Sequence, residues 1–156
     1  MPRIEEQIDI AAIPADVFRL CHSVDSRPEW DEQVIHIELL SPPPIRSGTL
    51  LRVDARQAGR SVFSWDGEVI TYQFPRSSQV RVIDVASSSP FAPGSQISWQ
   101  FSSVGSSTRL TWVWDYQAQG ILARIFDTLG GRASTQRAIR NSLNKLKAMV
   151  ESGRRT

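Results

Sequence analysis

The sequence predicts an α+β fold in which a curved, seven-stranded antiparallel sheet wraps around one long C-terminal helix. Three observations lead to this prediction. One strand pattern at the N-terminus is followed by two short helical patterns. From residue 33 to residue 117, apolar side chains then recur at every second position, which is the period of a β-strand. Beyond Leu122 they recur at every third or fourth position, which is the period of an amphipathic helix.

The N-terminal part provides the first strand and the two short helices. In residues 3–11, isoleucine alternates with charged and polar side chains, which predicts a half-buried strand. A helix is expected to begin at Pro14, because proline is well tolerated in a first helical turn. Residues 25–32 predict a second short helix, with Pro28 near its start.

The middle of the chain predicts six more strands with short connections. Turn-forming clusters such as Ser41-Pro-Pro-Pro44 and Gly105-Ser-Ser107 separate them. Short connections join antiparallel neighbours, and a sheet of this size twists and curls. No linker or repeat interrupts the pattern, so we expect one domain over residues 1–156. The predicted strands are 34–41, 48–57, 61–73, 79–87, 95–104 and 107–117.

The last helix is the only element long enough to cover the concave face of such a sheet. Two adjacent glycines, Gly130 and Gly131, predict a kink or a break between a short leading segment and the main helix. The apolar residues expected to face the sheet are Leu122, Ile125, Phe126, Leu129, Ala133, Ile139, Leu143, Leu146 and Val150.

Composition excludes several classes of protein. The net charge is only +2, and the basic residues near the C-terminus lie around the last helix, so we expect a solvated helix face and no nucleic-acid partner. Cys21 is the single cysteine, which allows no disulfide and suits a reducing cytoplasm. The N-terminus has no apolar signal region, and no stretch reaches membrane-spanning length. We therefore expect a cytoplasmic protein without stable membrane insertion, as a monomer or a homodimer.

Sequence motifs of common enzyme classes are also missing. There is no Gly-x-Gly-x-x-Gly, no P-loop, no Gly-x-Ser-x-Gly and no His-Glu-x-x-His. Rossmann-type hydride transfer, phosphoryl transfer and serine hydrolysis are therefore disfavoured. With two histidines and no suitably spaced carboxylates, we expect neither a metal site nor a cofactor.

The order of elements and several short motifs resemble one superfamily over nearly the whole chain. It is the START-like, or Bet v 1-like (SRPBCC), helix-grip superfamily, in particular its polyketide cyclase/dehydrase and lipid-transport branch. The motifs that carry the resemblance are Ile8-Asp-Ile-Ala-Ala-Ile-Pro-Ala-Asp-Val-Phe18, Trp30 within Pro28-Glu-Trp-Asp31, Ser47-Gly-Thr49, Trp99-Gln-Phe101, Thr108-Arg-Leu-Thr-Trp112 and Asn144-Lys-Leu-Lys-Ala-Met-Val-Glu151. The resemblance implies a cavity between sheet and helix that holds an apolar or aromatic molecule such as a polyketide, a lipid or a quinone.

Aromatic side chains are the candidates for the walls of this cavity. Trp112, Trp114 and Tyr116 share one strand face, and Trp99 is expected on the neighbouring strand. Indole and phenol groups suit flat ligands, but the same residues can equally form a plain core, and Trp30 can anchor the short helices. The candidate ligand-binding residues are Trp30, Trp65, Trp99, Phe101, Trp112, Trp114, Tyr116 and Phe126.

Four polar residues are the candidates for proton transfer: Tyr72, His36, Asp66 and Asp84. Asp66 shares a strand face with Tyr72, opposite more apolar residues, so it is expected to face water unless a bulge at Gly67 turns it inward. Asp84 can face either way, and His36 is expected to point outward; an inward His36 would be the natural proton shuttle. The other histidine, His22, is expected to have a structural role at a helix end, where a positive charge is favourable.

Three functions therefore remain open. The first is binding of a hydrophobic molecule with polyketide-type cyclisation or dehydration, which needs an inward polar group. The second is a non-catalytic lipid or quinone carrier, which needs only the apolar walls. The third is a protein-interaction module whose cavity is filled by its own side chains.

Overall fold

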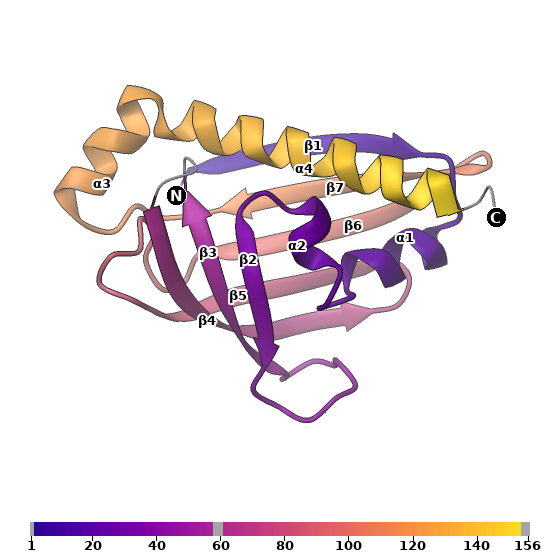
Figure 1. Ribbon diagram of the computed structural model, residues 1–156, viewed down its shortest axis with the longest axis horizontal. Helices are drawn as coiled ribbons and strands as arrows, with labels where there is room; N and C mark the ends of the chain where they lie inside the picture. Colours follow the sequence, from indigo (N-terminus) through magenta and orange to yellow (C-terminus); the bar gives the residue numbers. More distant parts are fainter. Residues whose placement is uncertain (1, 58–60, 154–156) are drawn as a thin grey trace.

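The computed structural model describes residues 2–57 and 61–153 and confirms the predicted fold. The described residues form a seven-stranded antiparallel sheet in the order β1-β7-β6-β5-β4-β3-β2, with a long helix across it (Figure 1). The strands are β1 (Arg3–Ile10), β2 (Val34–Leu39), β3 (Leu50–Gln57), β4 (Ser61–Gln73), β5 (Ser77–Val85), β6 (Gln96–Val104) and β7 (Ser107–Asp115). The helices are α1 (Pro14–Cys21), α2 (Arg27–Trp30), α3 (Gly120–Phe126) and α4 (Arg132–Gly153), with the π-type turn η1 (Asp127–Gly131) between the last two.

The element boundaries differ from the prediction by a few residues. Strand β5 begins at Ser77, two residues earlier than expected, because the turn after Pro75 is tight. Helix α2 is a single turn, shorter than the predicted 25–32. The number and order of the elements are as predicted.

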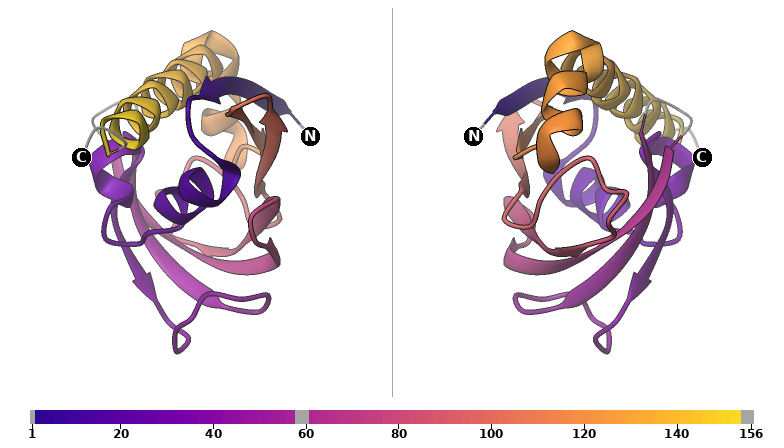
Figure 2. Two further views of the ribbon diagram at one scale, coloured as in Figure 1. Left: turned by 90° about the vertical axis from the view of Figure 1, so that its right-hand side faces the viewer. Right: turned by 90° about the vertical axis from the view of Figure 1, so that its left-hand side faces the viewer.

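The inner face of the sheet is aromatic where β6 and β7 pair. Their antiparallel register places Ile97 opposite Trp114, Trp99 opposite Trp112, and Phe101 opposite Leu110. Strand alternation sends these side chains to one face, and all except Ile97 are buried. Figure 2 shows the sheet curled around this face, with α4 lying across the open side.

Helix α4 closes the sheet with its apolar stripe. Ile139, Leu143, Leu146 and Val150 are buried against the core at the spacing expected of an amphipathic helix. The backbone N–H of Glu32 donates to Ser142 Oγ at 2.9 Å and so ties the segment after α2 to α4.

The predicted break before α4 is confirmed, but its consequence was not foreseen. Leu129 and Gly130 leave helical geometry, and Gly130 has a φ of 128° that favours glycine. Helix α3 therefore projects at the end of the molecule instead of covering the sheet (Figure 1). Leu122 and Leu129 are 83% and 79% exposed, and Ile125, Phe126 and Ala133 are exposed as well. The prediction that these five residues continue the buried stripe is wrong. For the four up to Leu129 the reason is that the break changes the direction of the helix, whereas Ala133 lies within α4 and is exposed there.

Candidate ligand-binding site

Two small chambers lie between the sheet and the helices in the part of the chain that the structure describes. Each has a volume of about 70 Å³. The first chamber lies toward α3, and its wall includes Phe63, Phe91, Trp112, Trp114, Tyr116 and Phe126. The second lies toward α1, and its wall includes Cys21, His22, Leu51, Val69, Tyr72 and Trp99.

The two chambers share part of their walls. Arg27, Val34, Trp65 and Ile97 line both of them. One chamber has roughly half the volume of an engineered cavity of about 150 Å³ that binds benzene. A ligand of the size of benzene therefore has to extend across both chambers, and a larger one also has to displace side chains that line them.

Arg27 is the polar group at this junction. Its guanidinium carbon lies 4.5 Å from the ring centroid of Trp99, 5.1 Å from that of Trp30 and 6.0 Å from that of Trp112. Its Nε donates to Asp31 Oδ2 at 2.7 Å. The side chains of Arg27 and Asp31 are 13% and 1% exposed, so the ion pair is buried. A buried charge needs such a partner, and here Arg27 begins α2 and Asp31 directly follows its last residue, at positions i and i+4.

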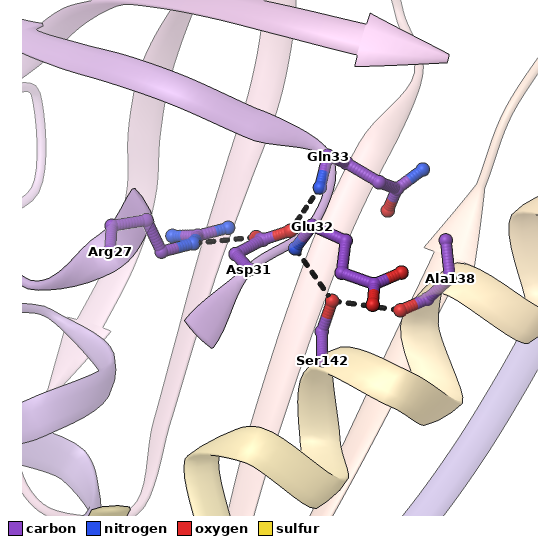
Figure 3. A network of polar contacts seen from close by, with 6 residues as sticks. All are labelled: Arg27, Asp31, Glu32, Gln33, Ala138 and Ser142. Atoms are coloured by element: carbon purple, nitrogen blue, oxygen red, sulfur yellow. Dashed lines mark hydrogen bonds and ion pairs between the residues drawn. The ribbon is translucent and has the colours of Figure 1, made fainter. Parts of the chain in front are cut away.

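Asp31 and its neighbours fix Arg27 in place (Figure 3). Asp31 Oδ1 accepts a hydrogen bond from the backbone N–H of Gln33 at 3.0 Å. The adjacent Glu32 N–H is bound by Ser142 of α4, whose hydroxyl also donates to the carbonyl of Ala138 at 2.7 Å. The orientation of the guanidinium is thus set by the turn after α2 and by α4 together.

Three tryptophans around Arg27 have buried indole N–H groups that lack a hydrogen-bond acceptor among the described residues. They are Trp30, Trp99 and Trp112. The rings pack edge-on or tilted, with centroids 5.5 Å apart for Trp99 and Trp112 and 5.9 Å apart for Trp30 and Trp99. Buried donors without acceptors are rare in proteins.

The second chamber has a polar end formed by His22 and Ser78. His22 Nδ1 lies 2.7 Å from the carbonyl oxygen of Phe18, and Nε2 lies 2.7 Å from Ser78 Oγ. A carbonyl oxygen only accepts, so Nδ1 carries the proton and Nε2 accepts from the Ser78 hydroxyl. The pKa of His22 is lowered to about 4, mainly by burial, which the hydrogen bond to Phe18 opposes and to which the positive charge of Arg27 adds. His22 is therefore neutral at physiological pH, and the expected benefit of a positive charge at the end of α1 is absent.

Tyr116, in the wall of the first chamber, is hydrogen-bonded to residues at the start of α4 and just before it. Its hydroxyl donates to Asp127 Oδ1 at 2.7 Å and accepts from Arg132 Nε at 3.1 Å. Burial and the Asp127 carboxylate raise the pKa of Tyr116 to about 12. Tyr116 also stacks on Trp114 with the ring planes 8° apart. The turn η1 and the first residue of α4 are thus connected to the chamber wall by a polar cluster.

Most of the aromatic residues predicted to bind the ligand lie along the chambers. Trp65, Trp99, Trp112, Trp114, Tyr116 and Phe126 all line one or both of them. Trp30 and Phe101 do not. Trp30 is buried behind Trp99, and Phe101 packs against Phe18 with the ring centroids 5.0 Å apart.

Of the residues predicted for proton transfer, only Tyr72 lines a chamber, and burial raises the pKa of its hydroxyl. His36 and Asp84 are exposed. Asp66 binds Arg52 with Oδ1 2.8 Å from Nε. The register of β4 does shift at Gly67, but the shift does not bring Asp66 into a chamber.

Sequence reasoning missed several polar residues that line the chambers, among them Arg27, Asp31, His22 and Ser78. One signal for the first pair was available. An arginine and an aspartate four residues apart on a short helix, with a tryptophan between them, form an ion pair beside an aromatic surface. No pattern in the sequence brings His22 to Ser78, because 56 residues separate them.

The sequence matches the family described as "Polyketide cyclase / dehydrase and lipid transport" over residues 1–151. The chain belongs to this family. The family and its structural relatives have a fold that binds hydrophobic molecules, which agrees with the chambers. A comparison with curated proteins gives no match.

Solved structures with the same fold include three bacterial proteins. TTHA0849 from Thermus thermophilus has a TM-score of 0.79 at 17% identity, covering 97% of this chain and 99% of the other. The Zhui aromatase/cyclase from Streptomyces sp. R1128 also has a TM-score of 0.79, at 16% identity, covering 96% and 93%. A START superfamily protein from Mycobacterium smegmatis has a TM-score of 0.75 at 14% identity, covering 96% and 97%. At these identities the likeness establishes the fold alone.

Membrane-spanning helices and metal-binding clusters are both missing from the described residues. None of the helices in this part of the chain is long and apolar enough to cross a membrane. The same residues contain no group of three or more histidine, cysteine, aspartate or glutamate side chains that could hold a metal ion.

Proposed function

We propose that this member of the family is a carrier that binds one flat, hydrophobic molecule across the two chambers. The observation that carries the proposal is the pair of aromatic-lined chambers joined at Arg27. Ligand pockets of this type are largely apolar and contain a few placed polar groups that set the orientation of the ligand. Arg27 and the His22–Ser78 pair are such groups.

Carriage is favoured over catalysis by the state of the polar groups inside. A general base works best when its pKa is near the working pH. His22 lies well below that range, with a pKa of about 4, and the pKa of Tyr72 is shifted upward. The predicted carboxylates Asp66 and Asp84 lie outside the chambers, and the two that line the first chamber, Asp31 and Asp127, are already ion-paired with Arg27 and Arg132. His22 and Tyr72 can hold a ligand by hydrogen bonds, but they are poorly suited to remove a proton from it.

A second candidate is cyclisation or dehydration of a polyketide-type substrate. It is supported by the Ser78–His22 hydrogen bond at the end of the second chamber, where a substrate hydroxyl could replace that of the serine. The likeness in fold to an aromatase/cyclase makes this reaction class worth testing. In that case the chambers would orient the substrate, and orientation alone contributes much of the rate enhancement in an intramolecular condensation.

The remaining properties follow from the same chemistry. We propose a cytoplasmic protein whose partner is a polyketide, a lipid or a quinone. Cys21 is buried and free, and burial raises the pKa of its thiol, which suits a protein that keeps its cysteine reduced.

Native mass spectrometry of freshly purified protein tests the proposal. We expect a species heavier than the chain by one small molecule, which is released on denaturation and can be identified. Incubation of the released molecule with ligand-free protein separates the two candidates: a carrier returns it unchanged, and a cyclase converts it. If no molecule co-purifies and no aromatic or acyl probe binds, the proposal is wrong.

A further inference from the structure

We infer that a polar cleft beside the first chamber is an anion site, and that the hydrophobic ligand carries a carboxylate or phosphate group that lies in this cleft. This inference rests on the proposed function and adds the chemical class of the ligand. It comes from the position of the cleft and from the charges along its walls.

The cleft lies between α4 and the neighbouring ends of β2 and β3. It has a volume of about 470 Å³, against about 70 Å³ for the first chamber. Its walls include Glu32 and Ala138, which Figure 3 shows where the segment after α2 meets α4. A group attached to a ligand in the first chamber can reach the cleft, because the two spaces share part of their walls. The shared residues are Asp31, Gln33, Val34, Arg56, Gln57 and Thr135.

The two carboxylates in the walls of the cleft are already paired. Asp31 lies 2.7 Å from Arg27, measured from Oδ2 to Nε. Glu32 lies 3.1 Å from Lys145, measured from Oε1 to Nζ. Neither carboxylate is therefore free to neutralise another cation of the cleft.

Two arginines in the cleft have no such partner. Arg56 lies near the end of β3 and Arg137 lies on α4, so the sheet and the helix each supply one positive charge. Both are exposed, and within residues 2–57 and 61–153 neither side chain has an ion pair or a hydrogen bond. A guanidinium group binds carboxylate and phosphate oxygens with two parallel hydrogen bonds. The cleft thus has an excess of positive charge that an anionic group of a ligand can balance.

The ligand that complements both spaces is an amphiphile. Its flat apolar part fits the aromatic wall of the first chamber, and its anionic group lies in the wider polar cleft. Ser134 and Asn141 also line the cleft and add a hydroxyl and an amide group that can donate hydrogen bonds to the anion. A neutral lipid or a quinone would leave the two arginines without a counter-charge. The arrangement therefore favours a hydrophobic acid or a hydrophobic phosphate ester over neutral molecules.

Two probes of nearly the same shape test for the anion site. At neutral pH, 2-naphthylacetate carries a carboxylate where 2-naphthylacetamide has a neutral amide. We expect the carboxylate to bind about tenfold more tightly in isothermal titration calorimetry at low salt, because two exposed ion pairs contribute a factor of roughly three each. The preference should shrink as salt is added, because exposed charges are screened.

A third probe distinguishes the two kinds of anion. In the same titration, 2-naphthyl phosphate places a phosphate on the same ring system. Binding tighter than that of 2-naphthylacetate supports a phosphate ester as the ligand, and weaker binding that still exceeds that of the amide supports a carboxylic acid. Binding weaker than that of the amide by both anions contradicts the inference.

Substitution of the two arginines connects the preference to the cleft. Arg56→Gln and Arg137→Gln should each lower the affinity for 2-naphthylacetate about threefold and leave that for 2-naphthylacetamide unchanged. The double variant should bind the two probes equally. Arg76→Gln is the matched control, because Arg76 is also exposed and without an ion pair among the described residues, but lies outside the cleft and both chambers.

The outcomes separate this inference from the proposed function. Equal affinity of wild type for carboxylate and amide overturns the anion site and leaves the proposed carrier function standing. Binding of no probe, together with the absence of a co-purifying molecule, overturns both. A preference for the carboxylate that Arg76→Gln reduces as strongly as Arg56→Gln and Arg137→Gln also contradicts the inference, because net charge alone would then account for it.

Discussion

Acidification should destabilise this protein through His22. Burial lowers the pKa of its imidazole to about 4 in the folded chain, from an ordinary value of 6.5. Well above pH 6.5 the imidazole is neutral in both the folded and the unfolded chain, so protonation of His22 does not reduce stability there. Below that value the unfolded chain takes up a proton that the folded chain does not accept until the pH nears 4. Stability is therefore lost as the pH falls through this window.

The size of the effect follows from the two pKa values. Their difference corresponds to at most about 3.4 kcal/mol once the pH is below both, and to about 2 kcal/mol at pH 5. Urea unfolding at about pH 7 and about pH 5 measures this loss. His22→Gln keeps a group that can hydrogen-bond to Phe18 and Ser78 but cannot titrate. The loss of unfolding free energy between these pH values should therefore be about 2 kcal/mol smaller in this variant than in wild type. His36→Gln is the matched control, because it makes the same substitution at an exposed position. An equal loss in wild type and His22→Gln would refute the reasoning.

Three other substitutions test the packing and the mouth of the site. Gly67→Ala should destabilise the protein by about 1–3 kcal/mol in thermal unfolding, because the new Cβ would lie 2.7 Å from the Trp65 ring. In the control Gly153→Ala the new Cβ meets no atom within 4 Å, so the stability should not change. Phe126→Ala should open the first chamber and raise the association rate of N-phenyl-1-naphthylamine several-fold in stopped-flow fluorescence; Leu122→Ala, on the same helix but outside both chambers, should not. Asp66→Asn should cost less than about 1 kcal/mol and leave binding unchanged, because its ion pair is on the surface; a loss of binding would contradict its placement.

Most of the fold could be predicted because local and tertiary preferences agree along this chain. Strand alternation and short turns specify the antiparallel order, and the glycines before α4 specify the break. The direction of α3 could not be predicted. The spacing of Leu122 and Phe126 continues the apolar period of α4, but a period carries no information on how a glycine break reorients the segment before it.

The walls of the site were easier to predict than its polar groups. Trp99 and Trp112 follow directly from alternation on neighbouring strands. The pairing of His22 with Ser78 and the burial of Arg27 depend on how α1 and α2 pack within the curl of the sheet, and residues far apart in sequence determine that packing. The candidates Asp66 and Asp84 were chosen for their chemistry, but the apolar residues of their strands occupy the inner positions instead.

The central claim, that a ligand binds across the two chambers, is tested most directly by filling their junction. Ile97 lines both chambers, so Ile97→Trp should occupy the shared space, whereas Ile83→Trp adds the same ring at an exposed position on β5. In fluorescence titrations with N-phenyl-1-naphthylamine, we predict that wild type and Ile83→Trp bind one molecule per chain and that Ile97→Trp, folded by circular dichroism, binds none. Unchanged binding by Ile97→Trp would contradict the account.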